Sequence, residues 1–108
     1  MSHRRIKTAG LLKELAATFF QKVSCGPALI TVTGCILSDD LQEAKILVSV
    51  LPDSQEEQAL DFLKRKRADF RDYVKKNAKL MSLPFFDVEI DRGEKNRQRI
   101  DEIFIHPI

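Results

Sequence analysis

The chain has little that would take it into or across a membrane. No apolar run approaches the about 20 residues that span a bilayer. The N-terminus lacks the uninterrupted apolar stretch and the small-residue cleavage site of a signal peptide. Internal repeats, low-complexity segments and Gly/Ser linkers are also missing, and 108 residues suffice for one hydrophobic core. We therefore expect a soluble protein of the cytoplasm with one folded domain.

Cysteine and histidine are too few and too scattered to predict a metal or redox site. Cys25 and Cys35 are ten positions apart. This spacing matches neither a C-x-x-C redox pair nor one half of a zinc site. His3 and His106 lie near opposite ends of the chain. Cys35 stands in an apolar, strand-like run, where a free cysteine acts as a small hydrophobic side chain. We expect no metal and no cofactor.

The short motifs of common active sites are absent as well. The chain contains no G-x-S-x-G, Walker A, H-E-x-x-H or Gly-rich dinucleotide loop. Asp87, Glu89 and Asp91 alternate along a predicted strand and could together hold a divalent cation. The simpler interpretation is the solvated face of a one-sided sheet, where alternating charge is common. We predict a protein that is not an enzyme and has no small-molecule substrate.

What the chain does have is segregated charge. The net charge of +2 conceals a basic start, since residues 1–24 carry five Lys or Arg against one acid. Residues 38–61 carry seven acids against one Lys, and residues 64–79 carry eight Lys or Arg against two acids. Such a dipolar molecule can attract a polyanion without a high overall charge.

Hydrophobic periodicity predicts five elements. Apolar residues recur at three- and four-residue spacing in two segments, and alternate with polar ones in three others. The predicted helices are 5–23 and 54–79, and the predicted strands are 29–37, 43–51 and 85–90. The first strand alternates around Ile30, Val32 and Ile36, with Thr31 and Thr33 between them. The predicted core contains Ile30, Val48, Leu63, Phe70 and Val88.

These elements predict a two-layer α+β domain. The first two strands are joined by a short connection and should form an antiparallel hairpin. The helices should cover one face of the three-stranded sheet, and the long helix should carry the chain back to place the third strand. We expect this domain to span residues 1–91. A tail at 92–108, charged at first and then apolar, should follow it and form a short docked helix or fray.

The long helix carries a basic band beside its apolar face. On a straight helix, a band of cations lies beside the apolar face that contains Leu63, and it consists of Lys64, Arg67, Arg71 and Lys75. The acids lie further around the helix, away from this band. Arg67 would lie close to the centre of the apolar face, which predicts a bend at residues 66–68. A helix edge of this kind can follow phosphates, although a solvated face with snorkelling side chains is an alternative.

Several segments together resemble the ribosome-binding factor A family. The first hairpin carries most of the resemblance, in the strings Ile30-Thr31-Val32-Thr33, Leu37-Ser38-Asp39-Asp40-Leu41, Ala44-Lys45 and Val48-Ser49-Val50-Leu51. Further matches are Leu12-Lys13-Glu14-Leu15, Phe70-Arg71, Leu80, Leu83-Pro84, Asp91 and Arg99-Ile100-Asp101. The similarity extends over nearly the whole chain. It departs from the family at Lys66-Arg67-Ala68, where the pattern is A-x-G, and at Gly26-Pro27-Ala28-Leu29, where it is D-P-R-L.

The resemblance implies a type II K-homology (KH)-like fold of order αββααβ with a kinked helix pair. It also implies a non-catalytic assembly factor that binds 16S rRNA on the free small (30S) ribosomal subunit. Such a factor supports late rRNA processing and matters most for growth in the cold. We expect the protein to act as a monomer.

The predicted RNA-binding surface combines the basic helix with the basic N-terminus. Its residues are Arg4, Arg5, Lys64, Arg65, Lys66, Arg67, Arg71, Lys75 and Lys76. Two other functions stay open, namely a KH-like domain for another RNA and a protein-interaction module that uses a sheet edge or the apolar tail. A second possible RNA surface lies on the tail, at Arg92, Lys95, Arg97 and Arg99.

Overall fold

The computed structural model describes residues 3–23, 28–80 and 82–93, with side chains from residue 6 onward. The helices are α1 (His3–Val23), α2 (Glu56–Arg65) and α3 (Arg67–Asn77), with a short 3-10 turn η1 (Asp53–Gln55) before α2. The strands are β1 (Leu29–Leu37), β2 (Glu43–Leu51) and β3 (Phe85–Ile90). This order confirms the predicted αββααβ arrangement. None of the described helices is long and apolar enough to cross a membrane.

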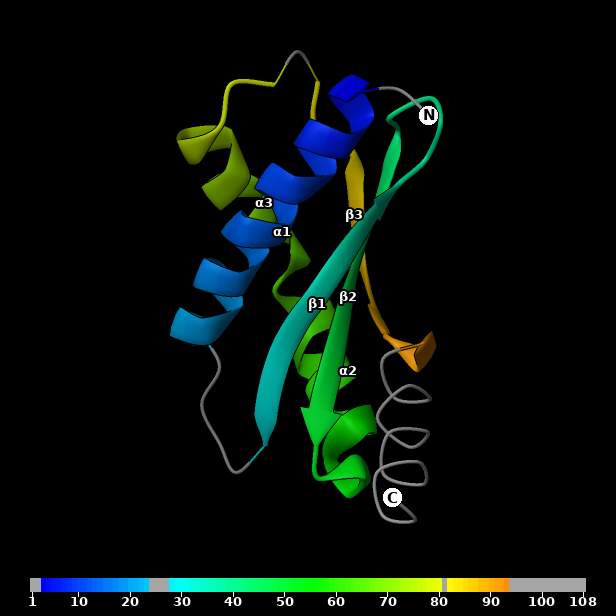
Figure 1. Ribbon diagram of the computed structural model, residues 1–108. Coiled ribbons are helices and arrows are strands. Elements are labelled where there is room, and N and C mark those ends of the chain that lie inside the picture. The colour runs from blue at the N-terminus through cyan, green and yellow to red at the C-terminus, as the bar shows by residue number, and fades with distance from the viewer. Residues whose placement is uncertain (1–2, 24–27, 81, 94–108) are drawn as a thin grey trace.

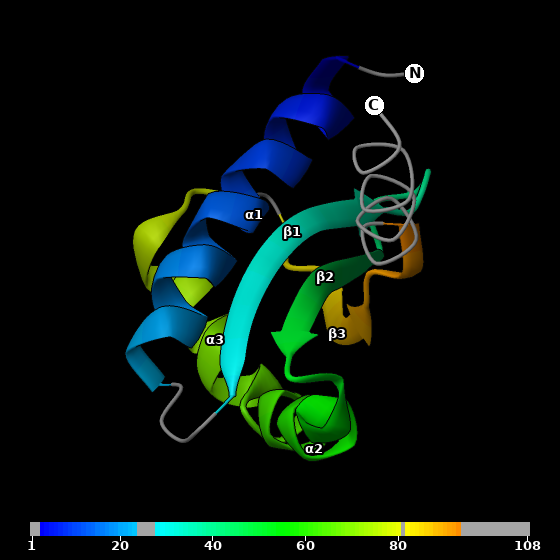
Figure 2. The ribbon, with the colours of Figure 1, turned by 60° about the horizontal axis from the view of Figure 1, so that its bottom comes forward.

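The three strands form one sheet in the order β1-β2-β3. β1 and β2 make the predicted antiparallel hairpin, and β3 pairs in parallel with β2 after the chain has crossed over through α2 and α3. Among the residues that the structure describes, the helices cover one face of this sheet and leave the other face open (Figures 1 and 2). The protein is therefore a two-layer α+β domain, as the sequence predicts.

The core lies between the helices and the covered face of the sheet. β2 contributes every second residue, so Ala44, Ile46, Val48 and Val50 are all buried. Phe20 and Phe70 stack with centroids 5.3 Å apart, which ties α1 to α3 over the sheet. The remaining buried side chains of the described residues are Leu12, Ala16, Phe19, Leu37, Ala59, Leu63, Val74, Pro84, Phe86 and Val88.

Four of the five predicted core residues are buried, and Ile30 is the exception. Val48, Leu63, Phe70 and Val88 are each at most 1% exposed. Ile30 is only partly buried, packed against the rim of the core. It pairs with Val50 near the start of β1, where the neighbouring Leu29 is 63% exposed, so this end of the strand lies at the margin of the core.

A β-bulge interrupts the regular alternation of β1. Val32 pairs with Val48, but Gly34 already pairs with Leu47, so Thr33 is an extra residue in β1. An extra residue shifts the alternation by one. Beyond the bulge Leu37 is buried, whereas Ile36 is 55% exposed on the open face.

Three sequence-based expectations fall outside the described residues. The predicted tail fold and the alternative RNA surface on the tail concern residues 94–108, apart from Arg92. The role of Cys25 lies in the segment 24–27, and Arg4 and Arg5 are placed in α1 without a description of their side chains.

Candidate nucleic-acid interface

The long basic helix predicted from the sequence is two helices that meet at Lys66. Lys66 has φ −93° and ψ 5°, away from regular helix geometry. Its N–H donates to the carbonyl oxygen of Leu63 at 3.0 Å, and its own carbonyl accepts the N–H of Phe70 at 2.9 Å. Leu63 and Phe70 are both buried. The predicted bend is confirmed, and it lets each half of the helix pair turn its apolar side to the sheet.

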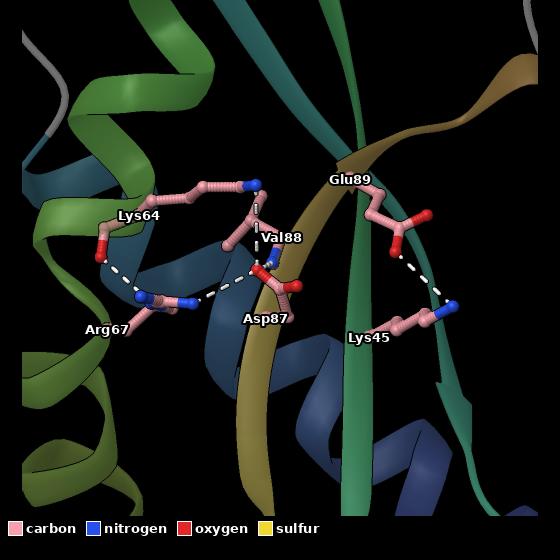
Figure 3. Close-up of polar contacts among 6 residues, drawn as sticks. All are labelled: Lys45, Lys64, Arg67, Asp87, Val88 and Glu89. Atoms are coloured by element: carbon pink, nitrogen blue, oxygen red, sulfur yellow. Dashed lines mark hydrogen bonds and ion pairs between the residues drawn. The ribbon is translucent and has the colours of Figure 1, made fainter.

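Arg67, the first residue of α3, connects this bend to the edge of the sheet. Its Nε donates to the carbonyl oxygen of Lys64 at 3.0 Å, and its guanidinium donates to Oδ1 of Asp87 on β3 at 3.2 Å. The ammonium of Lys64 lies 4.0 Å from the same carboxylate oxygen. Asp87 also accepts the backbone N–H of Val88 at 2.8 Å (Figure 3). Two cations and one amide thus surround one carboxylate at the β3 edge.

A shallow groove of about 350 Å³ lies between this bend and the start of β3. We call it the kink groove. It is lined by Lys64, Arg65, Arg67, Ala68, Arg71, Phe85 and Phe86. Four of these seven side chains are cations, and none is an acid. The groove therefore has a positive field that Asp87, beside it, offsets only in part.

An aromatic ring stands among these cations. Phe86 points into the core, so Phe85, its neighbour in the strand, points the other way and is 60% exposed. The guanidinium carbon of Arg67 lies 5.4 Å from the centroid of the Phe85 ring, within the range of a cation–π contact. A groove with charged donors and a flat ring can bind phosphates and stack a base.

The structure brings together four of the nine predicted RNA-binding residues, namely Lys64, Arg65, Arg67 and Arg71. The Lys66 ammonium lies 4.0 Å from the Asp69 carboxylate and 5.7 Å from the Phe62 ring, outside the groove lining. Lys75 and Lys76 are exposed in the last turn of α3, also outside the lining. Arg4 and Arg5 belong to the first turn of α1, which begins at the end of the molecule opposite to α2 (Figure 1).

The three acids predicted on one face of the third strand have protein partners, two on β3 and Asp91 directly after it. Asp87 pairs with Arg67, Glu89 lies 3.3 Å from the ammonium of Lys45, and Asp91 accepts the Thr33 hydroxyl at 2.6 Å (Figure 3 shows the first two). Within the described parts of the chain, no group of His, Cys, Asp and Glu side chains has the arrangement of a metal site.

Cys35 lies at the margin of the core, and its environment is that of an unreactive thiol. Burial raises the pKa of the Cys35 thiol to about 11, because a thiolate would lose its hydration there. At neutral pH the side chain is therefore a protonated thiol, which is a poor nucleophile and a poor metal ligand.

Two features of the groove were not predicted from the sequence. The pairing of Arg67 with Asp87 joins residues twenty positions apart, and no local pattern predicts which acid a cation will meet. Phe85 could have been found, because it is out of phase with the inward positions Phe86 and Val88 of the same strand. An aromatic residue at an outward-facing position of a strand indicates a possible binding surface.

Comparison with known proteins gives a consistent result. The sequence model of the family described as "Ribosome-binding factor A" matches residues 4–104. Ribosome-binding factor A of Bdellovibrio bacteriovorus is 30% identical over 106 residues, covering 93% of this chain and 78% of the relative. That of Thermodesulfovibrio yellowstonii is 35% identical over 99 residues, covering 86% and 84%.

Solved structures show the same fold. The crystal structure of ribosome-binding factor A from Thermus thermophilus superimposes with a TM-score of 0.72 at 22% identity, covering 80% of this chain and 94% of that one. The solution NMR structure of a Thermotoga maritima protein gives a TM-score of 0.73 at 22% identity, with coverage of 86% and 92%. At this identity the two structures support the fold and not the details of the groove.

Proposed function

The chain belongs to the ribosome-binding factor A family, a family of non-enzymatic maturation factors of the small (30S) ribosomal subunit, and we propose that it binds 16S rRNA through the kink groove. The observation that carries the proposal is the convergence of Lys64, Arg65, Arg67 and Arg71 around one groove. In this function the protein holds a conformation of the rRNA on the free subunit and so supports late processing. It acts as a monomer in the cytoplasm.

The separation of charges on the helix pair supports this site. The acids Asp61, Asp69 and Asp72 are exposed, but none of them lines the groove. Phosphates that enter the groove therefore meet cations without adjacent carboxylates, apart from Asp87 at its margin. Each phosphate contact releases condensed counterions, and this release supplies affinity that falls with salt.

The other predicted residues extend the surface beyond the groove. Lys75 and Lys76 continue the positive surface along α3, and Lys66 lies on the other side of the bend. Arg4 and Arg5 add cations from the start of α1. We propose that these five residues make peripheral phosphate contacts, which position the RNA without reading its sequence.

Sedimentation tests the proposed function directly. Tagged protein is mixed with a bacterial lysate and centrifuged through a gradient that separates free small subunits, large subunits and whole ribosomes. We expect it to travel with the free small subunits and to leave them as salt is raised. Protein that stays at the top of the gradient, or that resists high salt, would contradict RNA binding through the groove and favour apolar docking to a protein.

A further inference from the structure

Phe85 is an exposed apolar side chain in the middle of a charged surface. Among the described side chains it is the only large aromatic that is exposed, at 60%, whereas Phe86 beside it is 3% exposed. The other large hydrophobic side chains exposed on the described strands, Leu29, Ile36 and Leu51, are aliphatic and do not line the kink groove. A flat apolar ring surrounded by phosphate-binding donors has the composition of a base-stacking platform.

The ring is held in place before any ligand arrives. Arg67 lies against Phe85, with its guanidinium carbon 5.4 Å from the ring centroid. Arg67 is itself fixed at both ends of its guanidinium, by the Lys64 carbonyl oxygen at 3.0 Å and by Asp87 at 3.2 Å. A pre-ordered side chain loses little conformational entropy when it binds, so more of the contact energy is kept as affinity.

From this arrangement we infer that the kink groove accepts single-stranded RNA, and that one unpaired base stacks on the ring of Phe85. The inference rests on the proposed function, because it names the form of RNA that the same groove takes. A base inside a duplex has both faces covered by its neighbours, so only an unpaired nucleotide can offer a face to the ring. Lys64, Arg65 and Arg71 hold the phosphates on either side.

The groove is large enough for one small ligand such as a nucleotide. Its volume of about 350 Å³ is at the lower end of sites that hold a small ligand, about 300–1,000 Å³. Phe85 begins β3 at the edge of the sheet, so a strand of RNA can continue past the ring on both sides. Stacking is tolerant of sequence, because every base has a π-face.

A tryptophan in place of Phe85 makes the stacking visible. The chain has no tryptophan, so the Phe85→Trp variant carries a single indole. It is titrated with a short oligoadenylate, with a ribose-phosphate chain of the same length that lacks bases, and with an oligoadenylate–oligouridylate duplex. We expect the single strand to quench the indole fluorescence, and the abasic chain and the duplex to leave it nearly unchanged.

The matched control places the indole on the open face of the sheet. Ile36 is similarly exposed, at 55%, but lies outside the kink groove, so Ile36→Trp should keep its fluorescence with all three probes. Phe85→Ala should bind the oligoadenylate about 5- to 150-fold more weakly, which is the usual loss for one stacked base. Phe85→Tyr should restore most of the affinity.

The outcomes separate this inference from the proposed function. Binding of the single strand without quenching in the Phe85→Trp variant, or an unchanged affinity of Phe85→Ala, would overturn the stacking and leave the phosphate-binding groove standing. Tighter binding of the duplex than of the single strand would overturn the choice of single-stranded RNA. If the unaltered protein bound none of the three probes but still sedimented with small subunits, the inference would fail and the proposed function would stand; only the loss of sedimentation as well would overturn the proposed function.

Discussion

Arg67 and Asp87 are twenty residues apart in the sequence, yet a guanidinium nitrogen of Arg67 lies 3.2 Å from a carboxylate oxygen of Asp87. This contact fastens the bend between α2 and α3 to the outer edge of β3. The same guanidinium lies against Phe85, so the ion pair also fixes the wall of the kink groove. Arg67 is therefore a positioning residue of the proposed RNA site as well as one of its cations.

Breaking this ion pair should cost a modest amount of stability. Both side chains are about one-third exposed, at 38% and 31%, so water screens the attraction. We expect a coupling free energy of about 0.5–1 kcal/mol in a double-mutant cycle with Arg67→Ala and Asp87→Ala, measured by urea unfolding. The exposed pair Lys66–Asp69, at 4.0 Å, is the control and should couple by less. Equal coupling in the two cycles would remove the special role of Arg67.

Arg67→Glu is a poor probe of RNA binding, because Arg67 also forms the ion pair with Asp87. It would place a carboxylate beside Asp87 and so disturb the contact between the bend and β3, in addition to any effect on RNA. A charge-swapped protein with Arg67→Glu and Asp87→Arg should recover much of the stability that either single change loses.

Leu63 should be among the most sensitive core positions. It is fully buried beside the bend, and Leu63→Ala leaves a cavity that should lower the free energy of unfolding by about 2–5 kcal/mol. Leu29→Ala, at a side chain that is 63% exposed, should change it by less than about 0.5 kcal/mol. Urea melts measure both values. A loss at Leu63 no larger than that at Leu29 would refute the core described above.

The sequence predicted the fold well where the pattern is local. The alternation Ala44, Ile46, Val48 and Val50 defines the covered face of β2, and each of these residues is buried. The position of Arg67 near the apolar face was enough to predict the bend. Each of these signals needs only neighbouring residues, so a single sequence contains them.

The remainder depends on contacts between distant residues. The bulge at Thr33 follows from how β1 and β2 pair, and the alternation of β1 alone does not reveal it. The choice of Asp87 as the partner of Arg67 depends on the crossover that brings β3 beside α2 and α3. For the same reason, the sequence grouped Lys64 with Lys75, although only Lys64 lines the groove.

The hairpin loop contains an acid whose titration should report on its local bonds. The side chain of Asp40 accepts the Ser38 hydroxyl at 2.6 Å and the Gln42 N–H at 3.1 Å. These hydrogen bonds favour the carboxylate, so the pKa of Asp40 lies below its ordinary value. Because the folded-state pKa is lowered, the stabilising effect is present above the unfolded pKa and is lost as the pH falls through the folded value.

Removal of the Ser38 hydroxyl should reverse that shift. Ser38 is the first partner of the Asp40 carboxylate, so Ser38→Ala should raise the pKa of Asp40 toward its ordinary value. Carbon-detected NMR titration of the side-chain carboxyl measures it in both proteins. An unchanged pKa of Asp40 would mean that the Gln42 amide alone supports the carboxylate.

The charge of the kink groove should set both the affinity for RNA and its salt dependence. Arg65 and Arg71 line the groove and are exposed, and neither takes part in the Arg67–Asp87 pair. The double variant Arg65→Gln, Arg71→Gln should keep its fold and bind small subunits much more weakly. Its slope of log affinity against log salt should be shallower by about 1.5–2, because about two phosphate contacts are lost.

Lys13→Gln with Lys22→Gln is the charge-matched control for that experiment. Both lysines are exposed on α1 and outside the groove, whereas Lys45 is unsuitable because it pairs with Glu89. If net charge alone attracted RNA, the two double variants would weaken binding equally, since each removes two positive charges. A defect confined to Arg65 and Arg71 would instead assign the contact to the groove. If neither pair mattered, the RNA surface would lie elsewhere, and the peripheral cations Lys75 and Lys76 would be the next positions to change.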